Sequence, residues 1–133
     1  MKCGLFTLGD HLPNPLSGEY EDTQAERHQL WAELGVEGER LGFDALWLGE
    51  HHFNDYILSV PQMVLAAVAA RTEKIRLGTA VTLLAHYDPV MLAEQFSTLD
   101  LLSNGRAEIG FSTTLILDCV RTMVSGNNIE VAA

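Results

Sequence analysis

Four short apolar runs are the most regular feature of this sequence. They span residues 2–8, 43–48, 75–84 and 106–111, and most of the side chains in each run are hydrophobic. Strands of a parallel sheet that is covered on both faces show such continuous runs, whereas strands with one solvated face show strict alternation. We therefore predict four strands of a buried parallel sheet.

The segments between these runs carry the signals of helices. Residues 23–26 match a capping box ahead of apolar positions at helical spacing, and Gly42 stands where that helix would end. A second capping box covers residues 59–62, with proline in the first turn. A third helix is expected to begin after Asp88 and to end at residues 104–105, Asn-Gly. The alternation of strands and helices predicts an α/β fold.

The length and charge of the chain exclude several classes of protein. Its 133 residues suit one domain, but a complete (β/α)8 barrel takes about 250 residues and at least about 200. Acidic residues outnumber basic ones 18 to 8, which gives a net charge of −10. This balance argues against binding to a nucleic-acid backbone or to an anionic membrane surface, since both need basic patches.

The cysteines and the apolar stretches indicate the compartment. Cys3 and Cys119 lie far apart in the sequence and form no metal-binding or disulfide pattern. The amino terminus lacks the apolar core of a signal peptide, and no apolar stretch approaches the about 18 residues that a transmembrane helix needs. We expect a cytoplasmic protein with reduced thiols and no membrane partner.

The polar residues that could best take part in catalysis or ligand binding follow the second predicted strand. Glu50, His51 and His52 stand together where parallel sheets bind ligands, at the carboxyl end of a strand. Adjacent histidines in an extended segment point to opposite sides, so a shared metal ion is not expected. Acid–base or hydrogen-bonding work at a pocket, and bracing of the loop by Glu50 and one histidine, are the two alternatives that the residues leave open.

Several segments together resemble the bacterial luciferase-like monooxygenases. The resemblance lies in residues 42–53 (GFDALWLGEHHF), 75–81 (IRLGTAV), 86–95 (HYDPVMLAEQ) and 99–106 (LDLLSNGR), in that order and at matching intervals. It implies that the chain folds as parallel (β/α) units resembling the first half of a TIM barrel, with about four βα units.

The same resemblance implies flavin chemistry. Members of the family use FMN, or alternatively the deazaflavin F420, and reduced flavin reacts with oxygen before an aldehyde, alkane or sulfonate is oxidised. A partner flavin reductase generally supplies the reduced flavin. By resemblance, His51 matches a histidine that assists catalysis, and residues 80–81 match a strand bulge under the flavin ring that often contains a non-proline cis peptide bond. The cofactor-contacting residues that the resemblance implies are Phe6, Thr79, Ala80, Val81 and Ser112.

The chain departs from the family after the fourth strand. We expect residues 1–111 to form the luciferase-like half-barrel and residues 112–133 to form a divergent tail of the same domain, in which residues 114–124 suit a helix and residues 129–132 a short strand. The arginine and glycine that approach the flavin phosphate in relatives are missing from residues 110–114. This truncation is therefore expected to weaken flavin binding or to abolish it. Arg106 stands at the start of the fourth strand, where no phosphate clamp is expected.

Three hypotheses follow for the function and fold of this chain. The first is a truncated luciferase-like flavin-dependent monooxygenase. The second is a non-catalytic half-barrel that associates with itself or with a partner, because a half-barrel leaves strand edges unpaired and because the family often dimerises through its second and third helices. The third is a doubly wound sheet similar to flavodoxin, which requires a reversal of the strand order.

Overall fold

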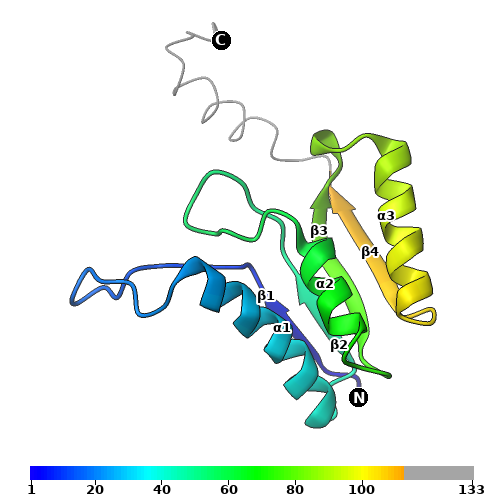
Figure 1. The fold of residues 1–133 in the computed structure, drawn as a ribbon, viewed down its shortest axis with the longest axis horizontal. Coiled ribbons are helices and arrows are strands. Elements are labelled where there is room, and N and C mark those ends of the chain that lie inside the picture. The colour runs from blue at the N-terminus through cyan, green and yellow to red at the C-terminus, as the bar shows by residue number, and fades with distance from the viewer. Residues whose placement is uncertain (113–133) are drawn as a thin grey trace, which may run out of the picture.

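The computed structural model describes residues 1–112, and the predictions for the tail beyond them lie outside the described residues. Three α-helices and one 3-10 helix alternate with four strands along this part of the chain (Figure 1). In chain order the elements are β1 (Gly4–Thr7), α1 (Gln24–Arg40), β2 (Ala45–Leu48), α2 (Pro61–Ala69), β3 (Arg76–Leu83), the 3-10 helix η1 (Leu84–His86), α3 (Pro89–Leu102) and β4 (Ala107–Ser112). The predicted order of strands and helices is therefore confirmed.

The four strands form one sheet in the order β1-β2-β3-β4, and every neighbouring pair is parallel. This order contains no reversal, so the doubly wound alternative is wrong. The helices α1, α2 and α3 lie side by side on one face of the sheet (Figure 1). Because all four strands run in the same direction, their carboxyl ends lie together at one end of the sheet. We call this end of the sheet the rim.

The core lies between the sheet and the three helices. Leu46 and Leu48 of β2 are fully buried there, together with Leu65 and Val68 of α2. Helix α2 is covered by the sheet and by both neighbouring helices, which agrees with its nearly continuous apolar sequence. The buried residues of α2 thus belong to the core of this chain and do not form an exposed docking face.

The opposite, concave face of the sheet is open among the described residues. Phe6 of β1 points to this face and is 56% exposed, and Trp47 of the neighbouring β2 lies over Gly78 and is only partly buried. The prediction of burial on both faces is therefore wrong for residues 1–112. The apolar runs reflect a sheet whose second face no described element covers.

Two of the three predicted helix starts agree with the structure. The Thr23 hydroxyl accepts from the N–H of Glu26, whose carboxylate accepts from the N–H of Thr23, as a capping box requires. The Asp88 side chain accepts from two backbone N–H groups at the start of α3. The Ser59 capping box is wrong, because α2 begins at Pro61 with Val60 at the N-cap and no side-chain cap. Proline favours the first helical position, which leaves Ser59 one residue outside.

Arg106 is buried at the amino end of β4, at the end of the sheet opposite the rim. Its guanidinium donates to backbone carbonyls at the end of α2, in the loop that follows α2 and at the end of α3. The expectation that Arg106 is no phosphate clamp agrees with this position. None of the described helices is long and apolar enough to cross a lipid bilayer.

Candidate functional site

The rim gathers polar side chains on both sides of the sheet. Residues 46, 48, 50 and 52 share one parity along β2 and its continuation, and Leu46 and Leu48 face the helices. Glu50 and His52 lie on this helical side, whereas His51 has the parity of Trp47 on the concave side. The two adjacent histidines have different partners, His52 the carboxylate of Glu50 and His51 the ring of Tyr56, as expected for side chains that point apart.

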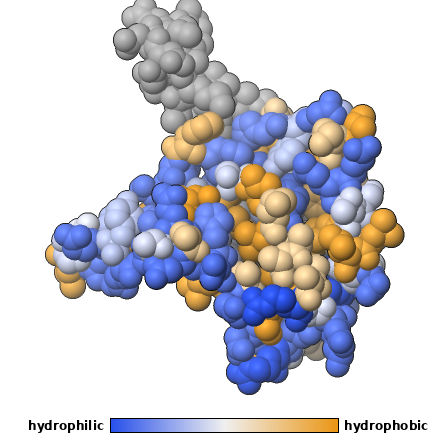
Figure 2. Space-filling model, in the orientation of Figure 1, coloured by the Kyte–Doolittle hydropathy of each residue, from blue (hydrophilic) through white to orange (hydrophobic). Residues whose placement is uncertain are grey.

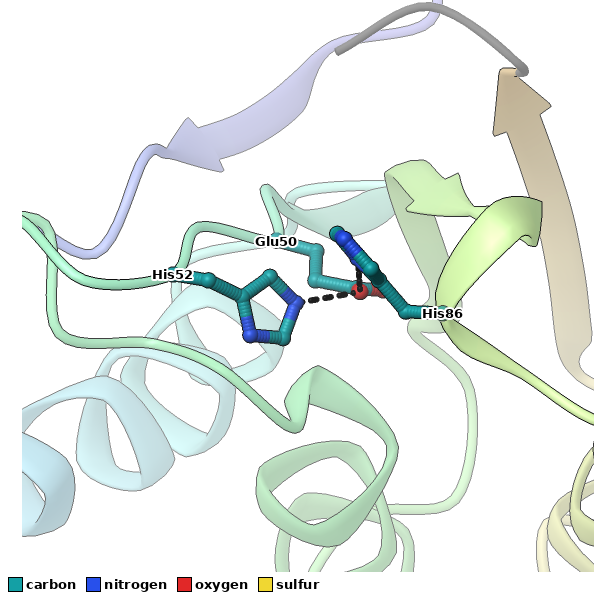
Figure 3. A group of neighbouring side chains, drawn as sticks. All are labelled: Glu50, His52 and His86. Atoms are coloured by element: carbon teal, nitrogen blue, oxygen red, sulfur yellow. Dashed lines mark hydrogen bonds and ion pairs between the residues drawn. The ribbon is translucent and has the colours of Figure 1, made fainter. Parts of the chain in front are cut away.

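Glu50, His52 and His86 form a compact cluster on the helical side of the rim. His52 reaches it from the loop after β2 and His86 from η1 after β3 (Figure 3). Both imidazoles approach the same carboxylate oxygen of Glu50, with 2.8 Å from Oε1 to Nε2 of His52 and 3.8 Å to Nδ1 of His86. The two rings meet edge to face, with their centroids 4.5 Å apart.

The Glu50 carboxylate has unusual surroundings for an acidic group. Its side chain is fully buried, and its other oxygen accepts from the backbone N–H of Leu83 at 3.3 Å. Burial raises the pKa of the adjacent Tyr87 hydroxyl to about 12. A hydrogen bond with Gln62 opposes this rise, whereas the charge of Glu50 and a hydrogen bond between Tyr87 and Glu50 add to it. Glu50 forms no ion pair with lysine or arginine among the described residues.

His51 occupies a separate environment. Its ring lies 4.9 Å from the ring of Tyr56, and its backbone N–H donates to the carbonyl of Leu58. Burial lowers the pKa of His51, nearby His52 lowers it further, and Glu50 opposes both effects. The neutral imidazole that results offers one donor and one acceptor to a group on the concave side of the rim.

The third strand changes register as it reaches the rim. The pairing of β3 with β4 shifts between Thr79 and Thr82, and the Ala80–Val81 peptide bond is cis, as the family resemblance implied. Ala80 and Val81 are both partly exposed. Thr79 is fully buried, and its hydroxyl donates to the carbonyl of Gly110. Within this bulge, Ala80 and Val81 are therefore the residues whose side chains reach the surface.

The remaining implied residues lie on the two outer strands. Phe6 stands on the concave face of β1, and Ser112 ends β4 at the rim. The residues that the resemblance implies for cofactor binding thus lie toward the carboxyl ends of β1, β3 and β4. Thr79 differs from the others, because its side chain is buried and is not accessible to a ligand.

The two remaining histidines belong neither to the Glu50 cluster nor to the surroundings of His51. His11 stacks on Tyr20, with ring centroids 4.6 Å apart, and its Nε2 lies 2.9 Å from the carbonyl oxygen of Asp22. His28 lies on α1 against Trp31. His86 follows the third apolar run in the sequence, but no local sequence pattern connects it with Glu50. The signal was available, because β2 and β3 were expected to be neighbours in a parallel sheet.

These features define the class of the molecule: an α/β chain of consecutive parallel βα units whose functional groups lie at the carboxyl ends of the strands. A model of the family described as luciferase-like monooxygenase matches residues 1–114. The chain belongs to this family, and its four parallel units resemble the first half of a TIM barrel, as expected.

Two relatives illustrate the similarity in sequence. The chain is 40% identical over 100 residues to the N-acetyl-S-alkylcysteine monooxygenase of Bacillus subtilis, covering 74% of this chain and 30% of the relative. It is 32% identical over 93 residues to the oxygenase component of the flavin-dependent trigonelline monooxygenase of Acinetobacter baylyi, covering 69% and 26%. The chain thus spans about three tenths or less of the length of these curated relatives.

Two solved structures share the fold. The monooxygenase RslO1 from Streptomyces bottropensis superimposes with a TM-score of 0.77 and 28% identity, over 98% of this chain and 37% of that one. The oxygenating constituent of 3,6-diketocamphane monooxygenase from Pseudomonas putida, solved in complex with FMN, superimposes with a TM-score of 0.75 and 22% identity, over 86% of this chain and 30% of that one.

Proposed function

We propose that residues 1–112 are the amino-terminal part of a flavin-dependent monooxygenase and contribute the ring side of a flavin site. The observation that carries the proposal is the concave side of the rim. There the exposed Phe6, the partly exposed Ala80 and Val81, and His51 belong to one end of the sheet. An isoalloxazine ring needs apolar surface on its faces and hydrogen-bonding groups at its polar edge, and these residue types supply both.

The described residues suit the ring of a flavin but not its phosphate group. A flavin phosphate needs charged donors, and the rim offers only Arg27, which pairs with Asp10 and Asp22. Arg76 and Arg106 lie at the amino ends of their strands, away from the rim. FMN would therefore contact residues 1–112 mainly through its ring.

A bound reduced flavin would supply the electrons that activate oxygen. The residues of this chain would position and shield it: Phe6 and the β3 bulge would cover part of the ring, and His51 would donate or accept one hydrogen bond at the ring edge or at the substrate. We propose FMN as the cofactor and F420 as the alternative. The relative named as an oxygenase component supports a partner flavin reductase for this chain, and the exposed free thiol of Cys3 suits the reducing cytoplasm.

Flavin titration of the full 133-residue chain tests this proposal. We expect saturable quenching of flavin fluorescence by the protein, with similar affinities for FMN and riboflavin, because the described contacts involve the ring. Phe6→Ala should weaken both at least about tenfold, a loss of about 1.4 kcal/mol. Phe111→Ala is the matched control, because Phe111 is similarly exposed, at 61%, but lies on the other face of the sheet. Glu108 of β4 pairs with Gly78 and shares the concave face with Trp47, and Phe111, three residues further along β4, has the opposite parity. No binding of FMN, riboflavin or F420 would contradict the catalytic proposal.

A self-associating half-barrel is the second candidate, and the surface of α2 and α3 favours it. Apolar side chains gather over these helices in the space-filling view (Figure 2). A groove of about 370 Å³ runs between them, lined among others by Val60, Met63, Met91 and Leu102, all of which are exposed. Exposed apolar surface of this kind often marks a protein interface.

Light scattering at several protein concentrations tests this candidate. A dimer that Met63→Lys dissociates would support association through the groove between α2 and α3. Leu16→Lys is the control, because Leu16 is 96% exposed and lies in the loop before α1, outside the groove. A monomer at all concentrations would exclude self-association and leave the flavin proposal to its own test.

A further inference from the structure

The cluster on the helical side of the rim has the composition of a transition-metal site. We propose that Glu50, His52 and His86 bind a divalent cation of the zinc type, independently of any flavin on the concave side. Two imidazoles and one carboxylate are a donor set that zinc and related first-row metals use in proteins. The three donor atoms lie within 4.8 Å of one another.

The spacing of the donor atoms suits one ion. Tetrahedral zinc with ligands at about 2.0–2.1 Å places neighbouring ligand atoms about 3.4 Å apart. The two distances from the Glu50 oxygen, 2.8 Å and 3.8 Å, lie on either side of this value. Small rotations of the two imidazoles would therefore bring all three atoms to bonding distance, and Figure 3 shows both rings already directed at one carboxylate oxygen.

The charge balance of the cluster gives a second argument. A fully buried carboxylate is costly unless a positive charge or several hydrogen bonds compensate it. Glu50 has one imidazole at hydrogen-bond distance and hydrogen bonds with the Leu83 N–H and the Tyr87 hydroxyl. Its second imidazole lies at 3.8 Å, too far for a hydrogen bond, and no lysine or arginine among the described residues pairs with Glu50. A divalent cation between the three groups would neutralise the carboxylate and give both imidazoles a partner.

The surroundings leave the ion a way in and hold its ligands in place. The side chains of His52 and His86 are 18% and 22% exposed, so solvent reaches the cluster past the two rings while Glu50 closes its inner side. The Leu83 N–H orients the carboxylate through its other oxygen. Outer contacts of this kind typically orient metal ligands.

Zinc binding to the full chain tests the proposal. The protein should carry Cys3→Ser and Cys119→Ser, because thiols bind zinc tightly by themselves. Calorimetric titration with zinc chloride should give one saturable site. Glu50→Gln, His52→Gln and His86→Gln should each weaken it at least about tenfold, since even the loss of an outer contact costs 10–100-fold. His28→Gln is the matched control and should change the affinity less than about twofold, because His28 lies on α1 and contacts the Gln24 carbonyl and the Trp31 ring, not the three donor groups.

A spectroscopic variant separates a metal site from a cluster that only braces the loop. His86→Cys in the same background should bind cobalt(II) with an intense near-ultraviolet thiolate-to-cobalt band, because the new sulfur would replace a ligand nitrogen. Circular dichroism of each variant verifies that it is folded. The absence of saturable zinc binding at micromolar concentrations, equal weakening by the His28 control, or a folded His86→Cys protein without the band would each overturn the proposal.

Discussion

Replacing Arg106 should cause one of the largest losses of stability that a single substitution produces in this chain. The residue is only 7% exposed, and each of its five N–H donors has a partner. Nε donates to the carbonyl of Ser103 at 2.7 Å, and the other four hydrogen bonds, of 2.9–3.1 Å, reach the carbonyls of Ala69, Thr72 and Ile75 and the hydroxyl of Thr72. One side chain thus joins the end of α2, the start of β3 and the end of α3.

The size of the effect follows from these contacts. Arg106→Met keeps most of the volume of the stem but removes all five donors. Buried acceptors left without a partner cost about 1–3 kcal/mol each, and these costs do not add fully because water reaches some of them. Breaking a buried charged network typically costs about 3–5 kcal/mol, and we expect a loss of this size in the free energy of unfolding. At an m-value of about 2 kcal/mol/M, the urea midpoint would fall by about 2 M.

Urea unfolding followed by tryptophan fluorescence measures this loss. Arg71→Met is the matched control, because Arg71 forms one ion pair with Glu33 in which both side chains are about half exposed, and such pairs contribute at most about 1 kcal/mol. Arg106→Lys keeps the charge but not the planar set of donors, so it should behave more like Arg106→Met than like the unchanged protein. An Arg106→Met protein within about 1 kcal/mol of Arg71→Met would refute the reasoning.

Three further predictions concern the packing, a helix cap and the pH dependence. Gly35→Ala should destabilise the chain by about 1–3 kcal/mol in thermal unfolding, because its Cβ would lie 2.5 Å from Cγ1 of Val68; unchanged or higher stability would contradict this packing. Thr23→Ala should cost about 1 kcal/mol in urea unfolding, whereas Ser59→Ala should cost almost nothing, since only Thr23 caps a helix. Burial alone raises the pKa of Glu39, but three backbone N–H donors hold it below 4.5 on balance. Its stabilisation is therefore present above pH 4.5 and lost as the pH falls through the lowered pKa, so Glu39→Gln should flatten the acid side of a stability–pH series; an unchanged slope would contradict it.

The arrangement of the sheet could be predicted because its causes are local. The caps at Thr23 and Asp88 and the glycine at position 42 mark helix ends through their own backbone hydrogen bonds and dihedral angles, and the structure reproduces them. The Ser59 cap failed for an equally local reason. Two signals competed within three residues, and Pro61 at the first helical position determined where α2 begins.

The cluster around Glu50 could be predicted only in part. The two-residue period of an extended chain separates His51 from His52, and the structure agrees. The partnership with His86 depends on a different strand and on the turn at η1, which brings an imidazole 36 residues away in the chain beside the carboxylate. Local sequence patterns carry no information on that distance, whereas the parallel pairing of β2 with β3 does.

The residues at the amino ends of the strands stabilise the fold, whereas those at the rim are available to bind other molecules, and the pattern of burial shows why. At the amino ends, Arg106 and Glu39 direct their charges at backbone groups of this same chain, so these charges have no capacity left for a ligand. At the rim, Glu50 is buried without an ion pair to lysine or arginine among the described residues, and Phe6 on the concave face is exposed. Groups whose interactions are incomplete within the described residues are those that another molecule can complete, and they lie where parallel strands end. The rim is therefore the part of this chain in which substitutions should alter binding before they alter folding.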